Sequence, residues 1–206
     1  MHSPYSGDLL REQLMIRGSE RLGGEPRLEK RDYRDSLGRT RVERPLIRGE
    51  NPPMVILIDD PVSCVQYTLD PQAKIAHRFA YPKPRAEEGN APRSAFVGAP
   101  STRGPKVESE ALGTKNLEGV LVEGRRTVTT FPKGAISQGE AVTQTEESWV
   151  SPELHLNVVQ KVFDSRQWEV TLRYVNLRRA EPDLRQFSPP LDYAIVEETG
   201  RFTVPY

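Results

Sequence analysis

The sequence has a single cysteine, Cys64, among its 206 residues. One thiol excludes an internal disulfide and any zinc site that is built from several cysteines. Cys64 precedes Val65 at the start of a predicted strand, so we expect a buried, inert thiol rather than a reactive one. The lack of a disulfide does not decide the compartment, because exported proteins without disulfides are common.

The chain also lacks an excess of charge of one sign and any long apolar run. Lys+Arg and Asp+Glu number 29 each, which gives a formal net charge of zero. A neutral chain has no overall attraction for nucleic acid or anionic lipid, so we predict no nucleic-acid partner. No stretch approaches the roughly 18 consecutive apolar residues of a transmembrane helix. The longest strongly apolar run covers only residues 54–58, so no membrane-spanning segment is expected.

Signatures of common catalytic and metal sites are missing as well. His2, His77 and His155 are far apart in the sequence and show no His-x-x-x-His spacing. The Gly-x-Ser-x-Gly nucleophile elbow, the phosphate-binding loop and the dinucleotide glycine pattern are absent. Adjacent carboxylates such as Asp59 and Asp60 point to opposite faces of a strand and so do not form an acid–base pair. We therefore predict no enzyme, no metal site and no cofactor.

What the sequence does contain is β patterning, which is densest in residues 143–193. Residues 143–150, 154–163 and 168–177 predict three antiparallel strands that are joined by short turns. Period-2 alternation places three apolar side chains of the last strand on one face: Val170, Leu172 and Tyr174. This stretch includes both tryptophans. We expect Trp149 to be structural, with a loss of roughly 3–5 kcal/mol on truncation, and Trp168 to contribute less.

The remaining strands are predicted from the same alternation and from turn residues. They cover residues 8–17, 27–34, 40–43, 54–58, 65–69, 75–81, 117–123, 125–131 and 192–196. Residues 27–34 are so polar that we expect an edge strand or a solvated one, whereas residues 54–58 are apolar on both faces and predict a central strand. A single helical turn is expected at residues 183–187. The predicted fold is mainly β, a single curled antiparallel sheet or incomplete barrel with little helix.

We expect one β domain that spans residues 1–206. Low hydrophobicity (36%) and 18 prolines indicate a modest core with much irregular chain. Residues 82–110 are rich in Pro, Ala, Gly and Ser and predict a long flexible loop. Residues 197–206 predict a frayed C-terminal tail.

Several motifs occur in a fixed order along most of the chain. They are Tyr33-Arg34-Asp35-Ser36-Leu37-Gly38-Arg39-Thr40-Arg41, Tyr67-Thr68-Leu69-Asp70-Pro71, Leu112-Gly113-Thr114 with Leu117-Glu118-Gly119-Val120, Glu147-Ser148-Trp149-Val150-Ser151-Pro152-Glu153-Leu154, Arg179-Ala180-Glu181-Pro182-Asp183 and the run from Phe187 to Tyr193. Together they resemble a family of uncharacterised exported bacterial proteins of the acidobacterial type. More distantly, the order of elements is similar to the lipoprotein-carrier (LolA/LolB-like) architecture, in which an antiparallel sheet curls around an apolar cavity.

The resemblance implies a periplasmic or secreted protein of the bacterial envelope. Residues 1–5 contain neither the basic n-region nor the apolar h-region of an export signal, which departs from the family pattern. Helices cover the cavity in lipoprotein carriers, and this sequence predicts little helix. The family has no established activity, so no catalytic residue is carried over.

These observations favour a non-enzymatic, extracytoplasmic binding module for an apolar ligand, either an acyl chain or a lipoprotein segment. The candidate lining residues on the concave face are Val55, Leu57, Tyr67, Phe79, Leu121, Val128, Leu172 and Tyr174. An ordinary hydrophobic core is the alternative explanation for all eight.

Two other functions stay open at this point. An envelope sensor or regulator would bind another protein, with the polar strand at residues 27–34 adding to a partner's sheet. A hydrolase with a dispersed site would use His77 or His155 as its base. The many arginines of residues 27–48 are interleaved with acidic residues and predict cross-strand ion pairs, with anion or lipid-headgroup binding as the sharper alternative. The oligomeric state is not indicated.

Overall fold

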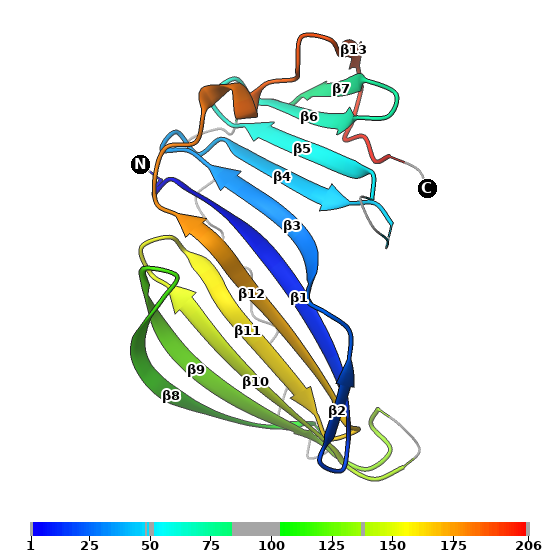
Figure 1. Cartoon of the computed structure of the whole chain (residues 1–206), viewed down its shortest axis with the longest axis vertical. Coiled ribbons are helices and arrows are strands. Elements are labelled where there is room, and N and C mark those ends of the chain that lie inside the picture. The colour runs from blue at the N-terminus through cyan, green and yellow to red at the C-terminus, as the bar shows by residue number, and fades with distance from the viewer. Residues whose placement is uncertain (1, 48, 50–51, 84–103, 137–138, 205–206) are drawn as a thin grey trace.

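The computed structural model describes residues 2–47, 49, 52–83, 104–136 and 139–204, and the regular secondary structure of this part is almost entirely β-sheet (Figure 1). The strands are β1 (Tyr5–Arg17), β2 (Glu20–Gly23), β3 (Arg27–Arg34), β4 (Thr40–Pro45), β5 (Met54–Asp60), β6 (Val65–Asp70), β7 (Ile75–Ala80), β8 (Lys106–Leu117), β9 (Val120–Phe131), β10 (Val142–Ser151), β11 (Leu156–Asp164), β12 (Trp168–Arg178) and β13 (Ala194–Glu197). A short 3-10 helix, η1 (Leu184–Phe187), lies between β12 and β13.

All of these strands belong to one sheet. Its order is β13-β7-β6-β5-β4-β3-β1-β12-β11-β10-β9-β8, with β2 paired to β1 outside this path. The pairs are antiparallel except for β13, which runs parallel to β7. In Figure 1 the long strands β1 and β12 run diagonally between an upper group, β3–β7, and a lower group, β8–β11. The sheet does not close, because β8 and β13 form its two ends. The prediction of a mainly β, curled antiparallel sheet with little helix is confirmed.

Aspartates shape the tight turns of the upper group. Asp60 Oδ1 accepts hydrogen bonds from the backbone N–H groups of Val62 and Ser63, at 2.9 and 3.1 Å. Asp70 Oδ1 accepts from Gln72 and Ala73 at the same two distances. Such side-chain bonds replace the missing backbone partners of a turn, which explains why the chain reverses at these positions. These two aspartate-stabilised turns connect β5, β6 and β7 into a meander.

The three predicted strands of residues 143–177 are also confirmed, as β10, β11 and β12. The turn between β11 and β12 is held by the buried carboxylate of Asp164. This carboxylate accepts hydrogen bonds from the Arg166 backbone N–H and from the Arg166 guanidinium, all at 2.8 Å. Gln144 on the neighbouring strand donates to the same carboxylate. These bonds hold the pKa of Asp164 well below its usual range, chiefly through the Arg166 side chain.

The prediction that residues 27–34 form an edge strand is wrong. Strand β3 lies inside the sheet, between β1 and β4. Several of its charged side chains form ion pairs, although Arg27, Glu29 and Arg31 stay exposed: Lys30 lies 2.7 Å from Asp32, and Arg31 lies 3.5 Å from Asp8 on β1. Arg31 also lies 3.7 Å from Glu43 on β4, so cross-strand ion pairs of the predicted kind are present. Strand β4 pairs only with residues 31–34 of β3, so residues 27–30 are paired with β1 alone.

The region around Gly124 differs from the prediction of two strands that meet there. Strand β9 is continuous through Gly124, and the chain reverses earlier, at Glu118 and Gly119, both with positive φ. Gly124 makes room for the ring of Trp149 on β10, because a Cβ atom at this position would lie 2.5 Å from that ring. Strand β9 pairs with β10 on one side and with β8 on the other, and the sequence pattern did not reveal β8.

Two further predictions need correction. Cys64 is half-buried in the turn between β5 and β6, with φ of 55°, and does not begin a strand. The C-terminal residues 197–204 are not frayed, because they pack on the sheet through contacts that are described below. Of the predicted loop at residues 82–110, residues 84–103 lie outside the described part, and β8 begins within the remainder at Lys106.

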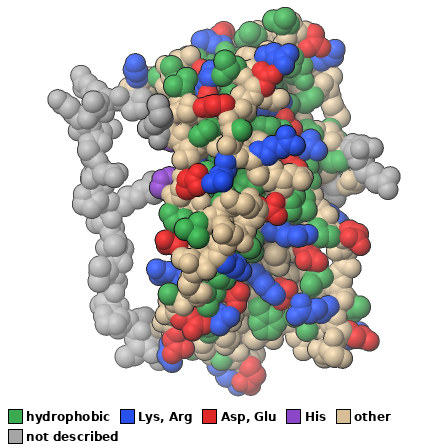
Figure 2. All heavy atoms as spheres, turned by 60° about the vertical axis from the view of Figure 1, so that its left-hand side comes forward, with side chains coloured by type: hydrophobic (Ala, Val, Ile, Leu, Met, Phe, Trp, Pro, Cys, Tyr) green, Lys and Arg blue, Asp and Glu red, His purple; other side chains and the backbone are tan. Residues whose placement is uncertain are grey.

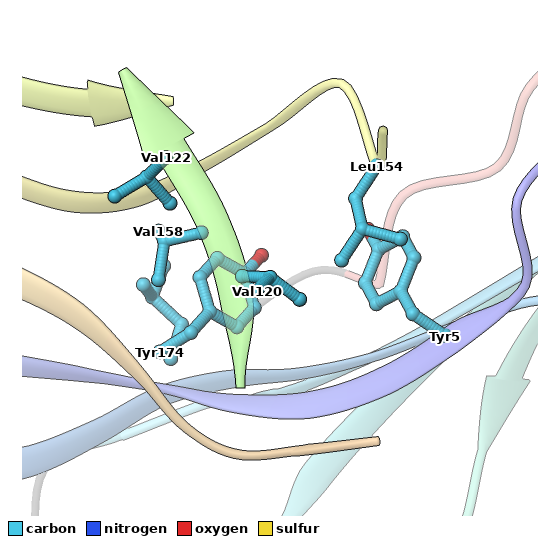
Figure 3. Close-up of a cluster of buried hydrophobic side chains, with 7 residues drawn as sticks. Tyr5, Val120, Val122, Leu154, Val158 and Tyr174 are labelled. Atoms are coloured by element: carbon cyan, nitrogen blue, oxygen red, sulfur yellow. The ribbon is translucent and has the colours of Figure 1, made fainter. Parts of the chain in front are cut away.

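Two hydrophobic cores hold the sheet together. The first contains Tyr5, Leu9, Val120, Val122, Leu154, Val158 and Tyr174 (Figure 3). Strand β9 is separated from β1 by three strands in the sheet, yet Val120 and Val122 of β9 pack in one cluster with Tyr5 and Tyr174. The lower group therefore curls back on itself.

The second core lies on one face of the upper group. It contains Ile58, Leu69, Ala76 and Phe187, with Tyr33, Ile56, Tyr67 and Tyr193 packed against it. Phe187 comes from η1, so this helix and the chain that follows it cover that face. Acidic, basic and apolar side chains are intermixed on the surface in Figure 2, in keeping with a net charge of zero.

Candidate functional site

The opposite face of the upper group carries a groove, and the strand register shows how it is built. Val42 on β4 pairs with Leu57 on β5, Leu57 pairs with Thr68 on β6, and Thr68 pairs with His77 on β7. Directly paired residues share a face of a sheet, so this row crosses all four strands on one side. The neighbouring rows extend the same face. They contain Thr40, Asp59, Gln66 and Phe79 on one side, and Arg44 and Val55 on the other.

The groove measures about 500 Å³, within the range of roughly 300–1,000 Å³ that is usual for small-molecule sites. Besides the residues of these rows it is lined by Ile58, Tyr67 and the C-terminal segment 201–204. Leu57, in the middle of the floor, is 36% exposed. This partly exposed apolar residue, at the centre of a sheet face beside the C-terminal segment, marks a candidate surface for an apolar ligand.

The C-terminal segment forms one wall of the groove. His77 Nδ1 lies 2.8 Å from Glu198 Oε1, and the His77 ring stacks on the Phe202 ring with centroids 3.5 Å apart. Thr68 Oγ1 donates to the Phe202 carbonyl at 3.2 Å. These contacts engage the polar atoms of His77 and Thr68, so the floor that remains beside the wall is made of Val42, Val55 and Leu57.

A buried polar cluster adjoins the groove at strand β3. Asp32, which pairs with Val42 across the β3–β4 ladder, is only 4% exposed. Its Oδ2 accepts a very short hydrogen bond from the Tyr174 hydroxyl and lies 2.7 Å from Lys30 Nζ. Its Oδ1 is buried and has no hydrogen-bond partner among the described residues.

Burial, and next the negative charge of Asp32, raise the pKa of both tyrosines in this cluster. The pKa of Tyr5 reaches about 12, and that of Tyr174 is raised further. Arg34 stacks over the Tyr5 ring at 4.7 Å and donates to the Leu154 carbonyl at 2.8 Å. The cluster therefore ties β1, β3 and β12 to the turn between β10 and β11.

The structure brings together only part of the predicted lining set. Val55, Leu57 and Phe79 face the groove together. Tyr67 borders the groove but packs against the second core. The other four predicted residues lie on β9 and β12, away from these strands: Leu121 is exposed, Val128 is half-buried, Leu172 packs against the first core, and Tyr174 is part of it. Ligand contact by any of the eight stays a prediction.

The groove residues that sequence reasoning missed include Val42 and Phe202. The alternation of Thr40, Val42 and Arg44 was a usable signal, because it places all three on one face. Phe202 gave no such signal, since it lies in a segment without strand pattern. His77 is half-buried, with Nδ1 beside Glu198 and its ring stacked on Phe202.

The two histidines that were considered as catalytic bases lie in different places. His77 is engaged in the groove wall, and His155 occupies the exposed turn between β10 and β11 with φ of 49°. Within the described residues, no group of three or more His, Cys, Asp and Glu side chains is placed to hold a metal ion. The described residues also contain no helix that is long and apolar enough to cross a bilayer.

No protein-family model and no curated protein matches the chain. Solved structures that align with most of it include the lipoprotein LppX of Mycobacterium tuberculosis, at 13% identity over 86% of this chain and 88% of LppX, with a TM-score of 0.30. LprF from Mycobacterium bovis aligns at 11% identity over 93% of this chain and 90% of its own, with a TM-score of 0.31. A DUF1329 family protein from Desulfovibrio piger aligns at 11% identity over 91% and 90%, with a TM-score of 0.22. Similarity at this level carries no conclusion about ligand or activity.

Proposed function

We propose that this protein is a non-enzymatic binding module that holds an apolar chain, such as an acyl chain, in the groove over β4–β7. The observation that carries the proposal is the uncovered apolar floor formed by Val42, Val55 and Leu57. On the opposite face of the same strands, Phe187 of η1 and Tyr193 pack in the second core. A floor left open on one face of a sheet that is packed on the other is typical of a binding surface.

The shape and chemistry of the groove fit an extended apolar ligand. The groove follows strand β5 from Val55 to Asp59, four residue steps that span about 13 Å at the usual strand rise. Apolar side chains form its floor, and Phe79 and Phe202 lie toward its sides. Removing apolar surface from water stabilises a complex by about 25 cal/mol per Å², so an alkyl chain along this floor gains affinity without directional contacts.

Introducing a charge at the centre of the floor tests the proposal. Leu57→Glu is expected to weaken the binding of a fluorescent apolar dye at least about tenfold, because an ionised carboxylate must be buried against the bound chain. Leu57 is partly exposed, so the variant is expected to fold. Binding is measured by dye titration, and native mass spectrometry after mild purification checks for co-purified lipid.

Leu121→Glu is the matched control. Leu121 is 53% exposed on β9 and does not line the groove, so this variant is expected to bind the dye like the unmodified protein. Equal binding by Leu57→Glu and the unmodified protein argues against the groove as the site. A protein that binds no dye and carries no lipid refutes the function itself.

We further propose that the protein works outside the cytoplasm, in the periplasm or as a secreted protein of the bacterial envelope. This location is supported by the sequence resemblance to exported bacterial proteins. An apolar groove suits that compartment, because lipids and lipoprotein segments that cross it need a cover for their acyl chains.

A further inference from the structure

The groove contains charged side chains that an entirely apolar ligand would leave unused. They are Arg44 on β4, Asp59 on β5, His77 on β7 and Arg201 in the C-terminal segment. Two of them are already engaged by the protein. Asp59 accepts a hydrogen bond from the Tyr81 hydroxyl at 3.2 Å, and His77 lies 2.8 Å from Glu198.

Arg44 and Arg201 differ from Asp59 and His77 in this respect. Both are exposed, and within the described residues no carboxylate lies within ion-pair distance of either. The basic side chains on the other face of the same strands do have partners: Arg41 lies 2.8 Å from Glu43, and Arg78 lies 2.8 Å from Glu197. Unpaired arginine is therefore a feature of the groove side.

Arg44 stands at the point where the apolar floor ends. It pairs with Val55 across the β4–β5 ladder, in the row next to Val42 and Leu57. Asp59 lies at the far end of the same face, paired with Thr40. The groove thus has a cationic end and an end that carries a carboxylate, which gives any bound chain a direction.

We propose that the ligand is an anionic single-chain amphiphile, whose carboxylate or phosphate head is held by Arg44 while its alkyl chain lies along Val42, Val55 and Leu57. This inference rests on the proposed function and specifies its ligand class. A guanidinium matches the two oxygens of a carboxylate or phosphate with two parallel hydrogen bonds.

The Arg44 guanidinium acts on the same side of the sheet as the buried cluster. Burial and Asp32 raise the pKa of Tyr174, and Arg44 opposes them, which requires its charge to be near that phenol. The neighbouring Lys30 is held by Asp32 at 2.7 Å. Arg44 is therefore the cation at this end of the groove that is available to a ligand.

Three ligands of equal chain length test the proposal: a saturated fatty acid, the corresponding alkyl phosphate and the corresponding alcohol. Calorimetric titration is expected to show that at least one anionic ligand binds about tenfold more tightly than the alcohol, the effect of a charge-assisted hydrogen-bond pair. Arg44→Gln is expected to remove this advantage and to leave alcohol binding unchanged. Arg125→Gln, at an exposed position on β9, is the matched control and is expected to leave all three affinities unchanged.

The outcomes separate the two proposals. Tighter binding of the fatty acid assigns a carboxylate head, and tighter binding of the alkyl phosphate assigns a phosphate head. Equal affinity for acid, phosphate and alcohol, or an Arg44→Gln variant that binds the anions as tightly as the unmodified protein, overturns the anionic head but leaves the apolar groove standing. Failure of all three ligands to bind overturns both.

Discussion

Trp149→Ala is expected to lower the free energy of unfolding by about 3 kcal/mol, at the lower end of the range for loss of a packed aromatic ring. The Trp149 ring fills the space over Gly124, where no side chain of β9 competes with it. Lys115 Nζ lies 3.5 Å from the ring centroid, and the ring packs against the first core. Removal of the ring therefore leaves a cavity between β8, β9 and β10. Chemical denaturation followed by circular dichroism measures the loss.

Trp168→Ala is the comparison for this result. Trp168 begins β12 beside the turn after Asp164 and lies outside both cores, so its removal is expected to lower the stability by only about 1 kcal/mol. A Trp149→Ala protein that is as stable as the unmodified protein, but binds the apolar dye poorly, would reverse the assignment. Trp149 would then belong to a binding site and not to the scaffold.

Tyr174→Phe is expected to lower the free energy of unfolding by about 2 kcal/mol, because it removes the hydroxyl donor from a buried carboxylate. In this variant Lys30 would be the remaining partner of the Asp32 carboxylate. The other carboxylate oxygen, Oδ1, already has no hydrogen-bond partner among the described residues. The double variant with Asp32→Asn is the control. Its loss is expected to be smaller than the sum of the two single losses, since both changes disrupt one interaction. Strictly additive losses would show that the Tyr174–Asp32 contact does not contribute.

The same cluster predicts how stability changes at high pH. Tyr5 and Tyr174 have folded-state pKa values above the ordinary value of about 10. Their contribution is therefore complete below about pH 10, where the unfolded tyrosines are also neutral, and is lost as the pH rises toward the folded values. Unfolding measured from pH 8 upward is expected to show a decline that begins near pH 10. In Tyr174→Phe the decline is expected to be shallower, because one of the two titrating phenols is absent.

The sequence identified strands wherever alternation or turn residues marked them locally. Strands β5, β6 and β7 were found because Asp60 and Asp70 punctuate the meander, and β12 was found because Val170, Leu172 and Tyr174 alternate with polar residues. Strand β8 was missed for a physical reason: as an end strand it has nearly all side chains exposed, so it shows no alternation between apolar and polar residues. The interior position of β3 was missed because its high content of charged residues suggested an edge, whereas Arg31 forms cross-strand ion pairs with Asp8 on β1 and Glu43 on β4.

The groove could be predicted only in part, since alternation tells which residues share a face and not which face is covered. Leu57 and Tyr67 were placed in one lining set, yet they belong to opposite faces of neighbouring strands. The covered face is decided by η1, whose Phe187 reaches the sheet from a part of the chain far away in sequence. The groove wall depends on Phe202, which meets His77 only because β13 runs along β7. Such long-range contacts leave no local pattern.

Photo-crosslinking with a fatty acid that carries a diazirine on its alkyl chain tests the central claim most directly. Mass spectrometry of the digested protein then locates the labelled peptides. The account predicts label on β4, β5 and β7 and on the segment 198–204, with labelling suppressed by excess unmodified fatty acid and by Leu57→Glu. Competable label confined to β8–β11, or labelling that excess fatty acid does not reduce, would contradict a binding groove over β4–β7.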